Sequence, residues 1–307
     1  MDTHVVFATI GTFDGLHLGH QALLEELRHE ASARGMRPAV VTFDPVPSAV
    51  LAPDKMPAQL YSTSERVALL RAMGFETIIL LNFQEALAQL SPLDFMQLLR
   101  DKYAVGGLLL GYDHHFGRRE PGGATPDYVA LGQTLGIEVL RSEALVLGGE
   151  VVSSSRVRHC LSMGQTREAN ELLGRLYSLS GQVVGGMQIG RSLGYPTANI
   201  KPEDPHKLIP ADGVYAVHIW LDRCACGERC TRYDGMLYIG DRPTLGGGLA
   251  RTIEVNIFDL SADLYAQRIR LEFVDYIRPN IRFASLEELT AQIARDEVQI
   301  RQVLKGA

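Results

Sequence analysis

The chain has 307 residues, of which 46% are hydrophobic and 21% are charged, and these are proportions of an ordinary globular protein. Its formal net charge is −6, which argues against a broad basic surface for nucleic acid. No apolar run reaches the ~18 residues that span a bilayer, and the first residues lack the basic start of a signal peptide, so we expect a cytoplasmic protein without a membrane partner.

Strand-like and helix-like stretches alternate over the first half of the chain. The expected strands are 5–10, 39–43, 77–83, 105–112 and 137–146, and the expected helices are 21–34, 62–74, 91–103 and 127–136. Two helix starts carry serine caps: Ser62 has Glu65 at capping-box spacing, and Ser91 precedes Pro92. The alternation predicts a parallel sheet covered on both faces, in which ligands bind beyond the carboxyl ends of the strands.

The pattern changes near residue 175. Two short helices are expected before this point, closed by Gly164 and Gly174. After it, strands are expected at 177–185, 213–222, 235–240, 252–260 and 267–277, with turn-rich segments and no crossover helix between them. This predicts a second domain that is antiparallel and all-β, a small barrel. The expected domains are therefore 1–175 and 176–307.

A terminal helix is expected at 285–304, where Ser285 and Glu288 have capping-box spacing. The helix carries one apolar stripe, which we expect to be core against the barrel rather than a partner surface. The stripe consists of Leu286, Leu289, Ile293, Ile300 and Leu304.

The four cysteines are Cys160, Cys224, Cys226 and Cys230. The last three lie in "CACGERC", which could hold zinc. This cluster has no CxxC knuckle and no evident fourth ligand close in sequence, so a surface hairpin loop with reduced thiols is the favoured interpretation.

The stretch "GTFDGLHLGH", residues 11–20, connects the first strand to the first helix. Gly11 allows a close turn, and Asp14 with Gly15 makes another. His17 and His20 flank the start of the helix, where unpaired N–H groups and the helix dipole favour an anion. Either the two histidines cap the helix only, or they grip phosphate oxygens as charge develops; each such donor could lower a barrier by roughly 3 kcal/mol.

This ten-residue stretch resembles the signature of the nucleotidyltransferase superfamily, and its fuller form resembles the bacterial FAD synthetases. "VTFDPVPS" (41–48), "GYDHHFGRR" (111–119) and "SSSRVRHCL" (153–161) resemble further elements of that family in the same order. The resemblance implies a Rossmann-like nucleotidyltransferase domain. It also implies an ATP and phosphate site made of Gly11, Phe13, Asp14, Gly15, His17, His20, Asp113, Ser154, Ser155 and Arg158.

Two residues depart from the family pattern. Ser155 stands where threonine is frequent, and it keeps the hydroxyl donor. His114 stands where the family usually has phenylalanine, which could perturb the adenine or flavin end of the pocket. Arg158 holds the family's arginine position, whereas Arg156 is a weaker candidate that could simply be solvated.

The second half contains "GRSLGYPTANI", residues 190–200. Gly190 and Gly194 allow a tight loop, and Pro196 fixes the backbone before the polar residues. Thr197 and Asn199 can lie on one side of an extended segment and meet a hard cation with its phosphates. A turn with two satisfied polar side chains is an equally good interpretation of this stretch by itself.

This stretch resembles the riboflavin kinase signature, as do "GVYAV", "YIGDRPTLGG" (238–247) and "IEVNIFDL" (253–260). The resemblance implies that Glu254 is the general base for the ribityl hydroxyl, and that Thr197 and Asn199 place Mg²⁺. Asn256 replaces the usual histidine, and Ala266 stands where glycine is frequent.

The resemblance extends over nearly the whole chain, and both domains follow the order of the bifunctional prokaryotic enzymes. It implies that the C-terminal domain converts riboflavin and ATP to FMN. The N-terminal domain would then join FMN and a second ATP into FAD and pyrophosphate. The alternatives are a kinase with a silent first domain, because of His114, or a non-enzymatic flavin-binding protein. We expect small-molecule partners only and a monomer or weak oligomer.

Overall fold

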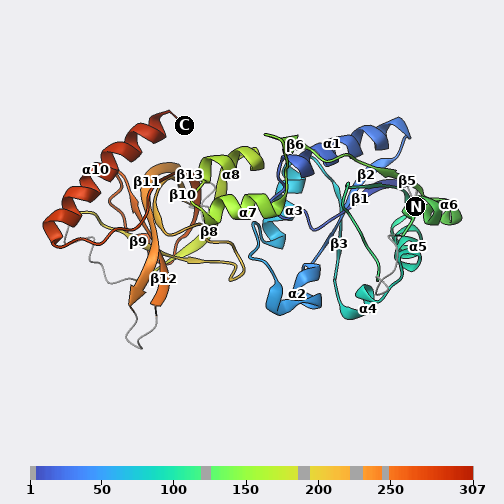
Figure 1. The fold of residues 1–307 in the computed structure, drawn as a ribbon, viewed down its shortest axis with the longest axis horizontal. Helices are drawn as coiled ribbons and strands as arrows, with labels where there is room; N and C mark the ends of the chain where they lie inside the picture. The colour runs from blue at the N-terminus through green and yellow to red at the C-terminus, as the bar shows by residue number, and fades with distance from the viewer. Residues whose placement is uncertain (1–4, 119–125, 186–193, 222–230, 244–248, 307) are drawn as a thin grey trace. The chain divides into compact units, whose positions relative to one another are not determined.

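The computed structural model of the chain describes residues 5–118, 126–185, 194–221, 231–243 and 249–306 (Figure 1). The chain divides into two compact units, Met1–Ser154 and Ser155–Ala307. Within the described residues, no helix is both long and apolar enough to cross a membrane.

The first unit is built on a five-stranded parallel sheet in the order β3-β2-β1-β4-β5, as predicted. Its strands are β1 (Val6–Ile10), β2 (Arg37–Phe43), β3 (Thr77–Leu81), β4 (Val105–Leu110) and β5 (Glu138–Arg141). The last predicted strand was too long: it ends at Arg141, and a separate hairpin of β6 (Val146–Leu147) and β7 (Glu150–Val151) follows. β5 stops there because its partner β4 ends at Leu110, opposite Arg141, and the hairpin itself turns at Gly148 and Gly149, which both have positive φ.

Helices cover both faces of this sheet (Figure 1). On one face, α1 (Leu18–Ala33) and α3 (Thr63–Ala72) bury leucines against the strands. On the other face, α5 (Pro92–Tyr103) and α6 (Tyr128–Leu135) close a second apolar cluster. The predicted caps are confirmed: Ser62 and Glu65 form a reciprocal capping box, and the Ser91 side chain accepts from the backbone N–H of Asp94. Three short helices were not predicted: α2 (Pro47–Leu51), η1 (Pro53–Lys55) and α4 (Glu85–Ala88).

The second unit contains a closed six-stranded antiparallel barrel, in the order β10-β11-β12-β9-β8-β13. Its strands are β8 (Tyr177–Val184), β9 (Ala198–Pro202), β10 (Gly213–Leu221), β11 (Thr231–Pro243), β12 (Leu249–Ile257) and β13 (Arg268–Arg278). The sequence predicted five of these strands and missed β9, which closes the barrel between β8 and β12.

Two helices, α7 (Ser154–Ser162) and α8 (Thr166–Leu173), lead into the barrel. The Asn170 side chain ties α8 to the barrel, because it donates to the carbonyl of Phe273 at 2.9 Å and accepts from the N–H of Tyr177 at 2.7 Å. The compact units therefore divide before these helices, whereas the sequence placed the boundary after them, at residue 175. The boundary between the functional domains stays a prediction.

The terminal helix α10 (Leu286–Lys305) lies along the outside of the barrel (Figure 1). Ile300 and Leu304 pack with buried residues of the strands, as the predicted stripe requires. Leu286 is 61% exposed, so the expectation that it belongs to the core was wrong; the stripe leaves the barrel at the start of the helix. Ser285 caps α10, but the carboxylate of Glu288 accepts from the N–H of Ala284, so the predicted reciprocal box is not formed.

Candidate active sites

The turn between β1 and α1 lies at the carboxyl edge of the parallel sheet. Phe13 (φ 51°) and Leu16 (φ 42°) adopt the left-handed backbone region although neither is glycine, and both side chains are buried. Such conformations cost of order 1–3 kcal/mol each and persist where surrounding contacts over-determine them. The Asp14 carboxylate supplies such contacts, because it accepts from the N–H groups of Leu60 (3.1 Å) and Tyr61 (3.0 Å).

His17 is the N-cap of α1. Its Nδ1 accepts from the backbone N–H of His20 at 3.3 Å, and the two imidazole rings stack with centroids 3.7 Å apart. A neutral imidazole that accepts at Nδ1 carries its proton on Nε2, so the His17 ring presents Nε2–H as a donor. Capping and phosphate binding are therefore compatible, since they use different nitrogen atoms. Gly19 leaves little room here, because a Cβ at this position would lie 3.1 Å from the Val152 carbonyl oxygen and 3.2 Å from the His17 ring.

Ser154, the last residue of the first unit, contacts this turn. The Ser154 hydroxyl donates to the Asp14 carbonyl at 2.7 Å, which brings the predicted residues Asp14, His17, His20 and Ser154 into one region. Ser155 and Arg158 follow on the same helix, within the second unit. Arg156 forms an ion pair with Glu168 at 3.0 Å, which is consistent with a structural role for that arginine.

The segment after β4 carries Asp113 and His114 at the same edge of the sheet, because β4 is parallel to β1 and adjacent to it. Asp113 is exposed. The Nε2 atom of His114 is buried and has no hydrogen-bond partner among the described residues. Burial lowers the pKa of His114 from 6.5 to about 4, against the nearby Asp113 charge, which acts to raise it. His114 is therefore neutral at pH 7.

Arg66 also touches this turn, and the sequence reasoning missed it. Its side chain is fully buried, and Nη1 donates to the carbonyl of Thr12 at 2.7 Å. Arginines on amphipathic surface helices are normally solvated. The sequence therefore did not predict that Arg66 is buried; it showed only that Arg66 lies in the first turns of a well-capped helix.

In the barrel, the polar residues of the second motif converge on Glu254. Thr197 Oγ1 donates to Glu254 Oε2 at 3.2 Å, and Asn199 of β9 is the direct cross-strand partner of Glu254 of β12. Asn256 donates to the carbonyl of Pro196 at 2.7 Å and so holds this segment to β12. The predicted residues Pro196, Thr197, Asn199 and Glu254 are thus close together.

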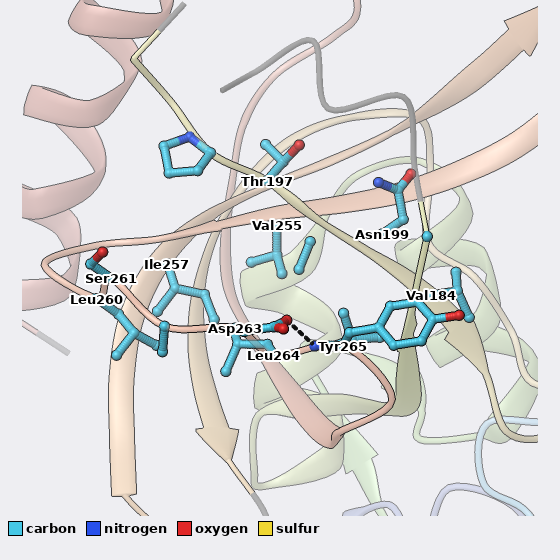
Figure 2. Close-up of a pocket in the computed structure, with 15 residues that line it drawn as sticks. Val184, Thr197, Asn199, Val255, Ile257, Leu260, Ser261, Asp263, Leu264 and Tyr265 are labelled. Atoms are coloured by element: carbon cyan, nitrogen blue, oxygen red, sulfur yellow. Dashed lines mark hydrogen bonds between the residues drawn. The ribbon is translucent and has the colours of Figure 1, made fainter. Parts of the chain in front are cut away.

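A cavity of about 780 Å³ opens beside these residues (Figure 2). Thr197 and Asn199 line one part of it. Its apolar wall comes from Val184, Val255, Ile257, Leu260, Leu264 and Tyr265. The loop that carries Tyr265 is fixed at both sides: Asp263 accepts from the Tyr265 N–H at 3.0 Å, and the N–H of Ala266 donates to Val183 at 3.0 Å. The cavity therefore has a polar part at Thr197 and Asn199 and an apolar part that can take a ring.

Tyr238 of β11 is a second residue that the sequence reasoning missed. It lies directly opposite Glu254 in the strand register. Burial, together with the charges of Asp212 and Glu254, raises the pKa of its phenol, so the hydroxyl stays protonated at neutral pH. A Cβ at Gly240 would overlap the Tyr238 hydroxyl, so a larger residue there would displace the Tyr238 side chain.

Some predicted residues fall elsewhere. Gly194 is described and has a φ of 81°, as a tight turn requires. Gly190 and the cysteines Cys224, Cys226 and Cys230 lie outside the described residues. Among residues that the structure describes, no group of three or more His, Cys, Asp or Glu side chains could hold a metal ion. The hydroxyl of Thr197 and the amide oxygen of Asn199 are nevertheless hard oxygen donors of the type that Mg²⁺ accepts.

Two family models match the chain. The model described as FAD synthetase matches residues 1–156, and the model described as riboflavin kinase matches residues 173–304. The chain is 36% identical over 298 residues to the bifunctional riboflavin kinase/FMN adenylyltransferase of Escherichia coli (strain K12), covering 96% of this chain and 91% of the relative. It is 34% identical over 295 residues to the Bacillus subtilis (strain 168) protein of the same name, covering 94% and 89%.

A solved structure is also similar. The crystal structure described as the macrolide-efflux protein of Streptococcus pneumoniae superposes with a TM-score of 0.84 at 30% sequence identity. The match covers 97% of this chain and 94% of that one, so it includes both units.

Proposed function

The chain belongs to the family of bifunctional riboflavin kinase/FMN adenylyltransferases, and we propose that the residues described above divide its two reactions between the two units. The protein phosphorylates riboflavin with ATP to give FMN, and it joins FMN to the AMP part of a second ATP to give FAD and pyrophosphate. The observation that carries the residue assignment is that each unit gathers its own set of predicted polar residues: His17 and His20 at the start of α1, and Thr197, Asn199 and Glu254 on the barrel.

In the kinase reaction, Glu254 acts as the general base. Its carboxylate takes the proton of the ribityl hydroxyl while that oxygen bonds to the γ-phosphorus and the bond to ADP breaks. The hydrogen bond from Thr197 fixes the orientation of this carboxylate, and its place on strand β12 keeps it rigid. Tyr238, opposite Glu254, adds a neutral hydroxyl on the same face of the sheet.

Thr197 and Asn199 are the residues that would hold Mg²⁺. Their oxygen atoms suit a hard cation, and both line the cavity. When bound, Mg²⁺ would offset the negative charge of the phosphates. We assign the apolar wall near Tyr265 to the ring of the nucleotide, because a cavity with one polar end and apolar sides matches a base joined to a triphosphate.

In the adenylyl transfer, a phosphate oxygen of FMN attacks the α-phosphorus of ATP and pyrophosphate leaves. The nucleophile is already an anion, so no general base is required; the site must screen repulsion between the phosphates. The Nε2–H of His17, the His20 ring and the N-terminal N–H groups of α1 are donors suited to this task. Asp113 after β4 completes the proposed set in the first unit, and Ser155 and Arg158 stay candidates from the sequence alone.

The direct test is product analysis by chromatography. Riboflavin with excess ATP and Mg²⁺ should give FMN and then FAD, and supplied FMN should give FAD. FMN accumulation without FAD would favour a kinase whose first unit is silent, and no product at all would favour a flavin-binding protein. Three points stay predictions from the sequence. The protein does not act on nucleic acid, it is a monomer or weak oligomer, and it lies in the cytoplasm.

A further inference from the structure

Arg66 is a fully buried cation near the adenylyl-transfer turn. Moving a guanidinium out of water costs several kcal/mol unless good hydrogen bonds replace the lost hydration. Three such bonds to described residues hold Arg66: Nη1 donates to the Thr12 carbonyl at 2.7 Å, and Nη2 donates to the Phe43 carbonyl at 3.2 Å and to the Thr63 hydroxyl at 2.9 Å. Because the burial of this guanidinium is costly, we expect it to have a role in the fold or in the site.

Those three bonds connect three segments at the carboxyl edge of the sheet. Thr12 lies in the turn after β1, Phe43 ends β2, and Thr63 begins α3. In a second contact the roles are reversed: the turn supplies the acceptor, the Asp14 carboxylate, and the N–H groups of Leu60 and Tyr61 donate to it. The segment 60–66 is therefore bonded to the turn twice, through the Arg66 guanidinium and through the Asp14 carboxylate.

The turn needs this support because it holds two unfavourable backbone conformations. Phe13 and Leu16 both have positive φ, and they lie on either side of Asp14 in the chain. Releasing them would change the direction in which the chain enters α1, and with it the position of His17, whose side chain caps that helix.

We propose that Arg66 and Asp14 are positioning residues for adenylyl transfer, holding the turn so that His17 and the helix N-terminus face the phosphates. Arg66 also places a positive charge within hydrogen-bond distance of the turn, at the Thr12 carbonyl. This inference rests on the proposed function of the first unit. It gives Asp14 a role in holding the turn, because each of its carboxylate oxygens accepts a backbone N–H group of the segment 60–61.

Three variants test the proposal. Arg66→Met removes the charge and all three bonds, and Arg66→Lys keeps the charge with fewer donors. Arg34→Met is the matched control, because Arg34 ends α1 at the opposite edge of the sheet and pairs with Glu138 at 2.6 Å. The measurements are thermal unfolding, FMN formation, and kcat and KM for FAD formation, together with KM for pyrophosphate in the reverse reaction.

We expect Arg66→Met to lower kcat/KM for FAD formation at least tenfold and to raise KM for pyrophosphate severalfold, while FMN formation stays within twofold. Arg66→Lys should recover part of the loss. Arg34→Met should unfold at a lower temperature and keep the wild-type kcat and KM.

The proposal is overturned by wild-type kinetics in folded Arg66→Met, by an equal kinetic loss in Arg34→Met, or by Arg66→Lys being no better than Arg66→Met. If Arg66→Met does not fold, wild-type kcat/KM in Arg66→Lys overturns it. Failure of the proposed function itself is seen separately, as FAD formation that persists when His17 and His20 are both replaced by alanine.

Discussion

Thr197 Oγ1 lies 3.2 Å from Glu254 Oε2, and this hydrogen bond joins the segment that enters β9 to the middle of β12. It links the residue proposed to hold the cation with the residue proposed to take the proton. The two functions therefore depend on one local arrangement, which Asn199 completes as the cross-strand partner of Glu254.

Replacing Thr197 with valine keeps the shape of the side chain and removes the hydroxyl. A hydrogen bond to a charged group contributes about 1.5–3 kcal/mol, so we expect FMN formation to fall roughly tenfold to a hundredfold. FAD formation from supplied FMN should not change. Thr252→Val is the control, because that hydroxyl donates to the Gly240 carbonyl of the neighbouring strand. Equal rates of FMN formation in both variants would contradict the role assigned to Thr197.

His114 should make the first unit sensitive to acid. Its pKa falls from 6.5 to about 4 on folding. Between these values the unfolded chain binds a proton that the folded chain does not, so stability is lost as pH falls from about 6.5 towards 4. The full loss is about 3 kcal/mol by linkage. His114→Phe should remove this loss in chemical unfolding across pH. The exposed His115→Phe is the control, and a His114→Phe profile that matches the wild type would refute the explanation.

Asp296 should anchor α10 to the barrel. Its carboxylate accepts hydrogen bonds from Arg278 Nε at 2.9 Å and Nη2 at 2.7 Å, and the Asp296 side chain is almost fully buried. Removing one partner of a buried ion pair leaves an uncompensated charge, so Asp296→Ala should lower the free energy of unfolding by about 3–5 kcal/mol. Asp259→Ala breaks an exposed pair with Arg301 and should cost at most about 1 kcal/mol. Urea unfolding distinguishes the two, and similar losses would show that the Arg278–Asp296 pair is not an anchor.

Ala266 has a φ of 61°, in the left-handed region that favours glycine. Ala266→Gly should relieve about 1 kcal/mol of backbone strain, partly offset by the greater freedom of glycine in the unfolded chain. The expected result is a small rise in the midpoint of unfolding of the second unit, with unchanged KM for ATP in FMN formation. A clear fall in the midpoint would show that the turn is not strained.

The sequence was informative where local signals act alone. The apolar run of β1, the glycine turn and the serine caps of α3 and α5 are local features, and the structure confirms them. The motifs singled out Thr197, Asn199 and Glu254, and the pairing of β9 with β12 brings them close together; their roles stay predictions.

Other features depend on contacts between distant segments. Strand β9 has five residues and ends at Pro202, and it is a strand because β8 and β12 pair with it on either side. Arg66 looks like a surface arginine on α3, and only the meeting of that helix with the ends of β1 and β2 buries it. Leu286 continues an apolar stripe in sequence, yet the barrel surface ends before it. No local pattern contains these relationships.

The central claim is that separate residues in separate units perform the two transfers. The most direct measurement compares the His17→Ala, His20→Ala double variant with Glu254→Gln, following FMN and FAD by chromatography. We predict that the double variant forms FMN at the wild-type rate but no FAD, and that Glu254→Gln forms no FMN but converts supplied FMN to FAD. FAD formation at the wild-type rate by the histidine variant would contradict the account.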